Sequence, residues 1–345
     1  MSAKGVSVDG GRGEPADVAL AESPDRAAQR YGSVAKRFAA QYSAVVALVL
    51  TVIIFGALRP ETFLTTDNLK TILSSQAVLL IVTLGLTLAL TVGEFDLSIG
   101  ATVGLTGVVV GWLNVTHAVP IGIVIVAALA TGLLIGCINA FLIVRLGITS
   151  LVATLGTSTV LAGISLGISN SIVVTGIDQG FTDLVSNGPF DLPLSVYFAF
   201  ALAIALWYLY EHTPLGRYLN LVGTGREVAR LSGLPVDRYR VLALVGTSVI
   251  AATAGLVLTG TLGSSDPTVG GTFLLPAFAG AFLGATTIRP GRFNAWGTVI
   301  ALYFLVTGIT GLNLLGITGW VEQVFYGGAL IVSVTIARLT SEPTS

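Results

Sequence analysis

The sequence predicts an all-α polytopic membrane protein with about ten transmembrane helices and both termini in the cytoplasm. Apolar residues make up 53% of the 345-residue chain, and the mean hydropathy is +0.88. Only 10% of the residues are charged, whereas soluble domains carry about 25%. The 42 glycines are spread through apolar runs, which is typical of helices that pack closely in lipid. Together these observations exclude an ordinary soluble domain.

Ten apolar runs are long enough to be candidate transmembrane helices, since crossing a bilayer takes about 20 residues. They are residues 40–58, 70–92, 98–114, 119–144, 149–168, 193–210, 240–262, 272–288, 295–312 and 319–338. The third run is short, and the fifth is rich in glycine, serine and threonine. An arrangement of eight or nine spans, with one re-entrant segment, therefore stays open.

The distribution of basic residues predicts the orientation of these spans. If the N-terminus is cytoplasmic, 15 of the 17 lysines and arginines lie inside, six of them in the N-terminal tail. The outer connections then hold only Arg59 and Lys70, and the longest of them, residues 169–192, has none. This separation follows the positive-inside rule and favours ten spans with both ends inside.

The chain divides into a membrane domain and two short tails. The predicted parts are a cytoplasmic N-terminal tail at 1–42, a transmembrane domain at 43–338 with a cytoplasmic loop at 211–240, and a cytoplasmic C-terminal tail at 339–345. Residues 1–25 are polar enough to be disordered, and 26–42 form a candidate surface helix. The first apolar run starts too late for a secretory signal peptide.

No pattern of catalytic or cofactor-binding residues is present. None of the three lysines lies in a P-loop, so ATP binding of that kind is excluded. The two histidines fall on opposite sides of the membrane in the predicted topology and cannot share a metal. Membrane-embedded acids are few, which argues against a proton- or sodium-driven carrier. We therefore expect a transport component without cofactor or metal, and not an enzyme.

One acidic segment, VGEFDLSIG at residues 92–100, separates two long apolar runs. Acids near lipid are costly and tend to face a cavity or a partner. One interpretation is structural, with the Asp96 carboxylate capping the helix that follows. The other is functional, with Glu94, Asp96 and Ser98 forming a gate or hinge on a transport path, or touching the solute directly.

The loop at 211–240 holds five arginines and predicts a short helix. Thr224 and Glu227 have the T-x-x-E spacing of a capping box, and Gly233 ends the helix after about two turns, near Ser232. An apolar side and an arginine fringe are typical of a helix that docks in a groove of another protein. The predicted docking residues are Thr224, Arg226, Glu227, Val228, Arg230, Leu231 and Gly233. The alternative is an amphipathic segment lying on anionic headgroups.

The path of the solute is only weakly marked. Aromatic and amide side chains stack on or hydrogen-bond polar solutes, and the candidates are Asn139, Phe278, Trp296 and Asn313. For any one of these residues, helix packing or an interfacial aromatic belt is the preferred explanation. The outer loops around 178–191 and 263–271 are candidate docking surfaces for an external protein.

Three ordered motifs resemble the permease subunits of ribose-type (monosaccharide) ABC transporters. They are VGEFDLSIGATVGLTG, PLGRYLNLVGTGREVARLSGLPVDRYRVL, which is similar to that family's coupling loop, and the C-terminal segment that begins FNAWGTVIALYF. The resemblance runs from about residue 43 to 338. Glu94 and Phe95 stand where the family usually has glycine and isoleucine, and residues 285–292 replace a stretch richer in glycine and serine.

The resemblance implies a permease subunit of an ATP-binding cassette importer in the bacterial inner membrane, which moves a sugar or similar polar solute by alternating access. The implied partners are cytoplasmic ATP-binding subunits, an extracytoplasmic sugar-binding protein and a second permease subunit, alike or different. No nucleic-acid partner is expected. The alternative function is a self-sufficient secondary carrier or channel.

Overall fold

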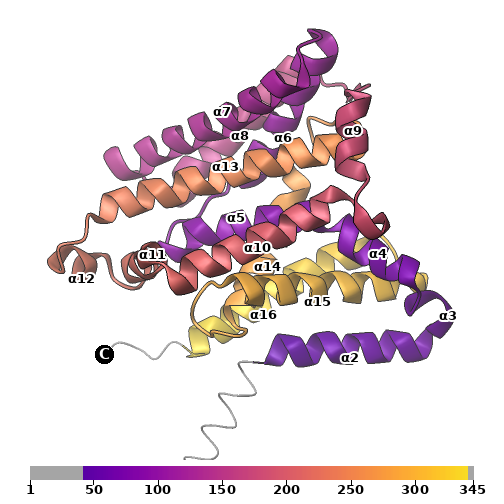
Figure 1. The fold of residues 1–345 in the computed structure, drawn as a ribbon. Helices are drawn as coiled ribbons and strands as arrows, with labels where there is room; N and C mark the ends of the chain where they lie inside the picture. The colour runs from indigo at the N-terminus through magenta and orange to yellow at the C-terminus, as the bar shows by residue number, and fades with distance from the viewer. Residues whose placement is uncertain (1–41, 341–345) are drawn as a thin grey trace, which may run out of the picture. The chain divides into compact units, whose positions relative to one another are not determined.

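The computed structural model describes residues 42–340, which form a bundle of helices (Figure 1). The predictions for the N-terminal tail up to residue 41, including most of the candidate surface helix, lie outside the described residues. The same holds for the last five residues of the chain.

Each of the ten predicted apolar runs coincides with a helix or a pair of helices. The helices are α2 (Ser43–Leu58), α3 (Pro60–Phe63), α4 (Thr66–Ser75), α5 (Ala77–Thr91), α6 (Ile99–Gly111), α7 (Ile121–Ala140), α8 (Ser150–Ser169), α9 (Gln179–Ser186), α10 (Leu194–His212), α11 (Pro214–Thr224), α12 (Arg226–Leu231), α13 (Val236–Leu262), α14 (Gly271–Ala285), α15 (Ala295–Leu314) and α16 (Trp320–Thr340). Two π-helical segments of five residues each, Trp112–Thr116 and Phe141–Arg145, continue α6 and α7 respectively.

The polytopic membrane class is confirmed by helix length and composition. Among the described residues, six helices are long and apolar enough to cross a membrane. A seventh span results if α4 and α5, which are bent by 42° at Gln76, form one broken helix. The helices α2 and α14 are apolar but have only 16 and 15 residues. The exact number of ten spans stays a prediction.

The long helix α13 lies at the centre of one group of helices and packs against α5, α6 and α7 (Figure 1). All 15 residues of α5 are buried, so this helix has no side facing lipid. Its threonines satisfy their hydroxyls inside the bundle; for example, Thr87 shares a 2.9 Å hydrogen bond with Tyr210 on α10. This central helix is therefore apolar apart from threonines whose hydroxyls are hydrogen-bonded, as a membrane interior requires.

Two close helix contacts depend on glycine. A Cβ atom on Gly100 of α6 would overlap the carbonyl oxygen of Gly270, where α14 begins. A Cβ atom on Gly223 of α11 would overlap the carbonyl oxygen of Thr91 at the end of α5. Small residues allow backbones to meet in this way, so α11 lies directly against the segment that follows α5.

On the side opposite to α12, the loops that connect the helices are held together by one strand pair and one ion pair. The two-residue strands β1 (Val174–Thr175) and β2 (Ser264–Ser265) pair antiparallel. Lys70 on α4 forms a 2.9 Å ion pair with Asp191 in the connection between α9 and α10. This ion pair lowers the pKa of the exposed Asp191 carboxyl, first through the hydrogen bond and then through the lysine charge.

Candidate functional site at the α10–α13 loop

Two helices and a turn occupy the predicted cytoplasmic loop. The first helix, α11, begins with Pro214 in its first turn, and the Thr213 hydroxyl accepts the N–H of Gly216 at 3.2 Å. This is a normal threonine N-cap. The second helix, α12, runs from Arg226 to Leu231, and Gly233 follows with a positive φ of 80°. The predicted short helix and its glycine stop are confirmed to within a residue.

The predicted capping box at Thr224 is wrong. The residue preceding α12 is Gly225, which is extended and makes no side-chain cap. Thr224 instead ends α11, and its hydroxyl donates at 3.1 Å to the carbonyls of Asn220 and Leu221. The T-x-x-E pattern fails here because a threonine hydroxyl satisfies the preceding helix as well as it starts a new one.

One side of α12 is buried and the other carries exposed apolar side chains. Ala229 is fully buried against the bundle, whereas Val228 is 60% exposed and Leu231 is 89% exposed. Leu234, which follows the helix, packs against the core. The apolar surface left open by α12 is therefore the pair Val228 and Leu231.

Arg226 at the start of α12 binds Glu94, which lies in the segment after α5. An Nη of Arg226 is 2.7 Å from the Glu94 carboxylate and also donates to the carbonyl of Gly93 at 3.2 Å. The Nε of Arg240, at the base of α13, lies 2.7 Å from the same carboxylate oxygen. The Glu94 side chain is 3% exposed. Two arginines thus neutralise one buried acid, the pairing that burial of a charge demands.

The remaining charges of α12 and α13 extend this cluster. Asp237 accepts from Arg230 at 3.3 Å and lies 3.5 Å from Arg240. Both arginines of the predicted docking fringe, Arg226 and Arg230, are therefore paired within the chain. Three arginines share the two acids Glu94 and Asp237, so the cluster keeps one positive charge. The exposed side chains of α12 without an ion pair among the described residues are the apolar pair Val228 and Leu231 and the acid Glu227.

Two residues after Glu94, the same segment forms a buried cluster of polar side chains, which we call the polar node. Asp96 is fully buried, and one carboxylate oxygen accepts the N–H of Ser98 at 2.9 Å and its hydroxyl at 2.6 Å. Asn139 on α7 donates to the Ser98 hydroxyl at 2.8 Å. Within the described residues, the second oxygen of Asp96 and the amide oxygen of Asn139 have no hydrogen-bond partner.

The interpretation of Asp96 as a cap of the first turn of α6 needs correction. Its carboxylate binds Ser98, the residue before the helix, and none of the N–H groups inside the first turn. A lone carboxylate oxygen without a partner in a buried site is costly. The node therefore has spare hydrogen-bonding capacity that helix capping does not use.

Hydroxyl groups of α8 hold the segment from Glu94 to Ser98 in place. The N–H of Phe95 donates to Ser150 at 3.1 Å, and the N–H of Leu97 donates to Thr154 at 3.0 Å. The ring of Phe95 stacks on Phe278 of α14 with centroids 6.2 Å apart. A non-helical segment inside a helical bundle needs such side-chain partners for its backbone.

The predicted path residues do not meet at one place. Asn139 joins the polar node, and Phe278 packs on Phe95 next to it. Trp296 and Asn313 lie at opposite ends of α15. A cavity of about 270 Å³ instead lies between α6, α8 and the start of α14. It is lined mainly by small residues, including Gly100, Gly104, Ser158 and Ser165, and Leu97 reaches it.

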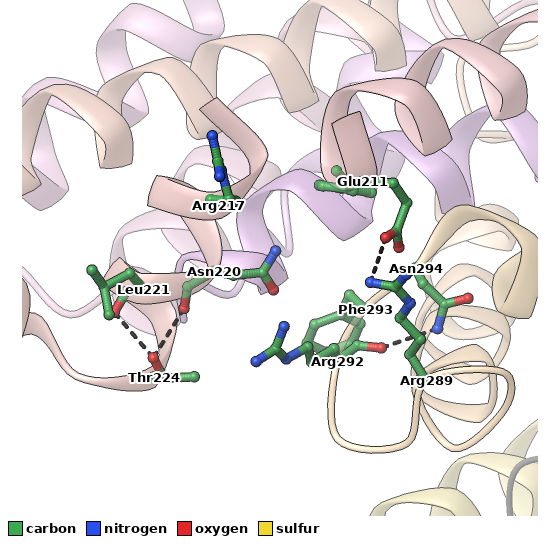
Figure 2. A pocket seen from close by; sticks show the side chains of 10 residues that line it. Glu211, Arg217, Asn220, Leu221, Thr224, Arg289, Arg292, Phe293 and Asn294 are labelled. Carbon is green, nitrogen blue, oxygen red and sulfur yellow. Dashed lines mark hydrogen bonds and ion pairs between the residues drawn. The ribbon is translucent and has the colours of Figure 1, made fainter. Parts of the chain in front are cut away.

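A larger pocket of about 530 Å³ opens between α11 and the turn that joins α14 to α15 (Figure 2). Arg289 is ion-paired with Glu211, and Arg292 points from the turn toward Asn220 and Thr224. Asn294 fixes the turn, since its side chain donates to the carbonyls of Gly284, Thr287 and Arg292. Two of the lining residues, Arg289 and Arg292, belong to the stretch 285–292 where the sequence departs from the resembling permeases.

Sequence reasoning missed Arg240, Asp237, Ser150 and Thr154 as members of the site. Only Asp237 and Arg240 carry a local signal, because their i, i+3 spacing on α13 places them on one face. The two hydroxyls of α8 lie more than 50 positions from their backbone partners, and no local pattern marks them.

Comparison with known proteins identifies the family to which this chain belongs. Residues 68–334 match the family model described as branched-chain amino acid transport system / permease component. The D-allose transport system permease protein of Escherichia coli is 31% identical, over 88% of this chain and 93% of its own. The autoinducer 2 import system permease protein of Photorhabdus laumondii is 30% identical, over 88% and 92%. The ribose import permease protein of Haemophilus influenzae is 28% identical, over 86% and 93%.

The family match spans more than half of the chain, and the relatives are aligned over nearly their whole length. This supports the transport interpretation over the enzyme and the self-sufficient carrier. The chain belongs to the family of branched-chain amino acid transport system permease components, the membrane subunits of ATP-binding cassette importers.

Proposed function

We propose that this permease imports a monosaccharide or a similarly small polar solute across the bacterial inner membrane. The relatives are named for D-allose, ribose and autoinducer 2, all of which are small and polar. The small cavity between α6, α8 and α14 has glycine and serine in its wall, which suits a solute that passes without tight binding. The solute moves by alternating access, together with a second permease subunit.

The coupling element is α12, which docks in a groove of a cytoplasmic ATP-binding subunit. The observation that carries this proposal is the exposure of Val228 and Leu231 on a helix whose opposite side is buried. Apolar side chains presented on a short helix are the anchors of helix-in-groove recognition. The headgroup alternative is disfavoured because Arg226 and Arg230 already have acidic partners within the chain.

The pocket of Figure 2 supplies a second contact with the same ATP-binding subunit. Within the described residues, the guanidinium of Arg292 makes no ion pair and faces the pocket. An acidic side chain of the partner fits this position, because arginine binds carboxylates with two parallel hydrogen bonds. On the opposite side, the loops near 178–191 and 263–271 receive the extracytoplasmic solute-binding protein.

The segment with Glu94, Asp96 and Ser98 acts as the gate or hinge, with Asn139 and Phe278 beside it. Its polar node has two oxygens without partners among the described residues, and its backbone is held by α8 hydroxyls that are able to exchange partners. A movable segment on a transport path needs hydrogen bonds of this exchangeable kind.

Docking of α12 is tested by replacing its exposed leucine. We expect Leu231→Asp to reduce co-purification of the ATP-binding subunit by about tenfold, because a charge in an apolar groove costs at least 1–2 kcal/mol. Leu64→Asp is the matched control, since Leu64 is 61% exposed but belongs to the connection between α3 and α4. Equal amounts of ATP-binding subunit with the parent and Leu231→Asp permeases would contradict the docking proposal.

A further inference from the structure

Glu94 is the acid that joins the loop between α10 and α13 to the membrane interior. It stands where the resembling permeases usually have glycine, so the ion pairs it forms depend on this chain's own residue. Its carboxylate receives Arg226 from α12 and Arg240 from α13, each at 2.7 Å. No other acid among the described residues is buried between two arginines.

The two arginines hold Glu94 in different ways. Arg240 is 11% exposed and belongs to a long helix packed in the bundle. Arg226 is 42% exposed and belongs to a six-residue helix at the surface. Arg240 therefore fixes Glu94 to the static part of the bundle, whereas Arg226 ties it to the element that we propose meets the partner.

The short distance along the chain from Glu94 to the polar node makes the connection stiff. Asp96 is two residues away, and the backbone between them is bonded to Ser150 and Thr154. A displacement of the Glu94 backbone must move Asp96 or break these hydrogen bonds, because two residues of backbone span at most about 7 Å. Either result changes the node formed by Asp96, Ser98 and Asn139.

There is space beside this ionic cluster for such a displacement. A pocket of about 510 Å³ lies between the cluster and the turn that joins α7 to α8, with Gly147 and Thr149 in its wall. The start of α12 is thus not wedged against that turn. The loop meets α5 at a second place, where the backbone of Gly223 packs tightly on Thr91. Gly223 belongs to α11, so this contact changes only if the whole of α11 moves.

We propose that Glu94 is a positioning residue that transmits movement of α12 into the 94–98 segment through its ion pair with Arg226. This inference rests on the proposed docking of α12. It adds that the charge pair, and not the packing of Gly223 on Thr91, carries the movement. Arg240 keeps the carboxylate buried but does not transmit.

The movement of the segment is measured with a cysteine reporter that needs no knowledge of the solute. Leu97→Cys places a thiol at the wall of the small cavity, in a background where the sole native cysteine is removed by Cys137→Ala. The rate of its reaction with N-ethylmaleimide is followed in the purified complex with its ATP-binding subunits. Rates are compared without nucleotide and with ATP and vanadate.

In the reporter protein we expect ATP and vanadate to change the labelling rate several-fold. Glu94→Gln and Arg226→Gln should each bring the ratio of the two rates close to one, a loss within the range for residues along a coupling path. The Glu94→Gln/Arg226→Gln double variant should lose no more of the nucleotide effect than Glu94→Gln alone, since Arg226→Gln then removes no further ion pair. Arg238→Gln is the matched control, because Arg238 is exposed at the start of α13 and is not one of the arginines that bind Glu94, and it should label like the parent.

Three outcomes would overturn the inference. One is an unchanged nucleotide effect in Glu94→Gln and Arg226→Gln, and another is a parent reporter that does not respond at all. The third is loss of the ATP-binding subunit from these variants, since Glu94 would then act on docking. Failure of the docking proposal is read separately, from co-purification with Leu231→Asp. If Glu94→Gln does not accumulate in membranes, Arg226→Gln, which alters a partly exposed side chain, carries the test.

Discussion

At the scale of single residues, the structure assigns different tasks to side chains that the sequence grouped together. Arg226 and Arg230 both belong to the predicted docking fringe, yet each is bound to an acid of its own chain. Val228 and Leu231 have no such partner and stay exposed. The distinction follows from direction, because side chains on opposite sides of a short helix meet different surroundings.

Asn294 shows how one side chain fixes a turn at this scale. Its amide oxygen accepts the N–H of Gly297 at 2.7 Å, and its amide nitrogen donates to three carbonyls of the preceding turn. We expect Asn294→Ala to destabilise the permease by about 1–3 kcal/mol, since a helix cap and buried carbonyls lose their partner.

The midpoint of thermal unfolding in detergent measures this effect. Asn313→Ala is the control, because Asn313 lies at the other end of the same helix and is exposed. A midpoint for Asn294→Ala equal to that of Asn313→Ala would show that the turn does not depend on this amide.

At the scale of elements, the short connection between α5 and α6 organises the site. The chain leaves α5 at Thr91, meets α11 at Gly223, binds α12 through Glu94 and reaches the polar node before α6 begins. The four other elements that hold it, α7, α8, α13 and α14, come from distant parts of the sequence. This connection is therefore placed by packing as much as by its own residues.

The contact between α6 and α14 gives an element-scale prediction. We expect Gly100→Val to destabilise the protein by about 1–3 kcal/mol, because added side-chain atoms would overlap the backbone of Gly270 and push the helices apart. Gly156→Val is the matched control on α8, where a Cβ atom meets nothing within 4 Å.

Resistance to unfolding in sodium dodecyl sulfate, read as helical circular dichroism, checks the prediction. Equal resistance of the two variants would mean that the close approach of α6 and α14 is not needed for stability.

At the scale of the whole molecule, membership of the permease family separates this chain from a self-sufficient carrier. Proteoliposomes that contain the permease alone should take up no D-allose above protein-free vesicles. Uptake should require the ATP-binding subunits, ATP and the solute-binding protein, because the chain has no nucleotide-binding motif of its own. Radiolabelled D-allose, with D-ribose in parallel, serves as the probe. Uptake by the permease alone, dissipated by an ionophore, would restore the carrier alternative.

Much of the fold was predictable from local patterns. Apolar runs located the ten helical regions, since a membrane helix must satisfy its own backbone and needs an apolar exterior. The end of α12 followed from Gly233, whereas its start was placed to within a residue from a capping box at Thr224 that does not form. The capping role of Thr224 was not predictable, because the same hydroxyl is able to end one helix or begin the next.

The sequence by itself determined the membrane class, the helical regions and the short helix of the loop at 211–240, because hydropathy and turn chemistry act over a few residues. Only the tertiary structure decided that Glu94 pairs with Arg226 and Arg240, which lie 132 and 146 positions away. It also decided that Asp96, Ser98 and Asn139 meet in the buried core. The physical reason is that a buried charge is stable only where packing delivers its partners, and packing depends on the whole bundle at once.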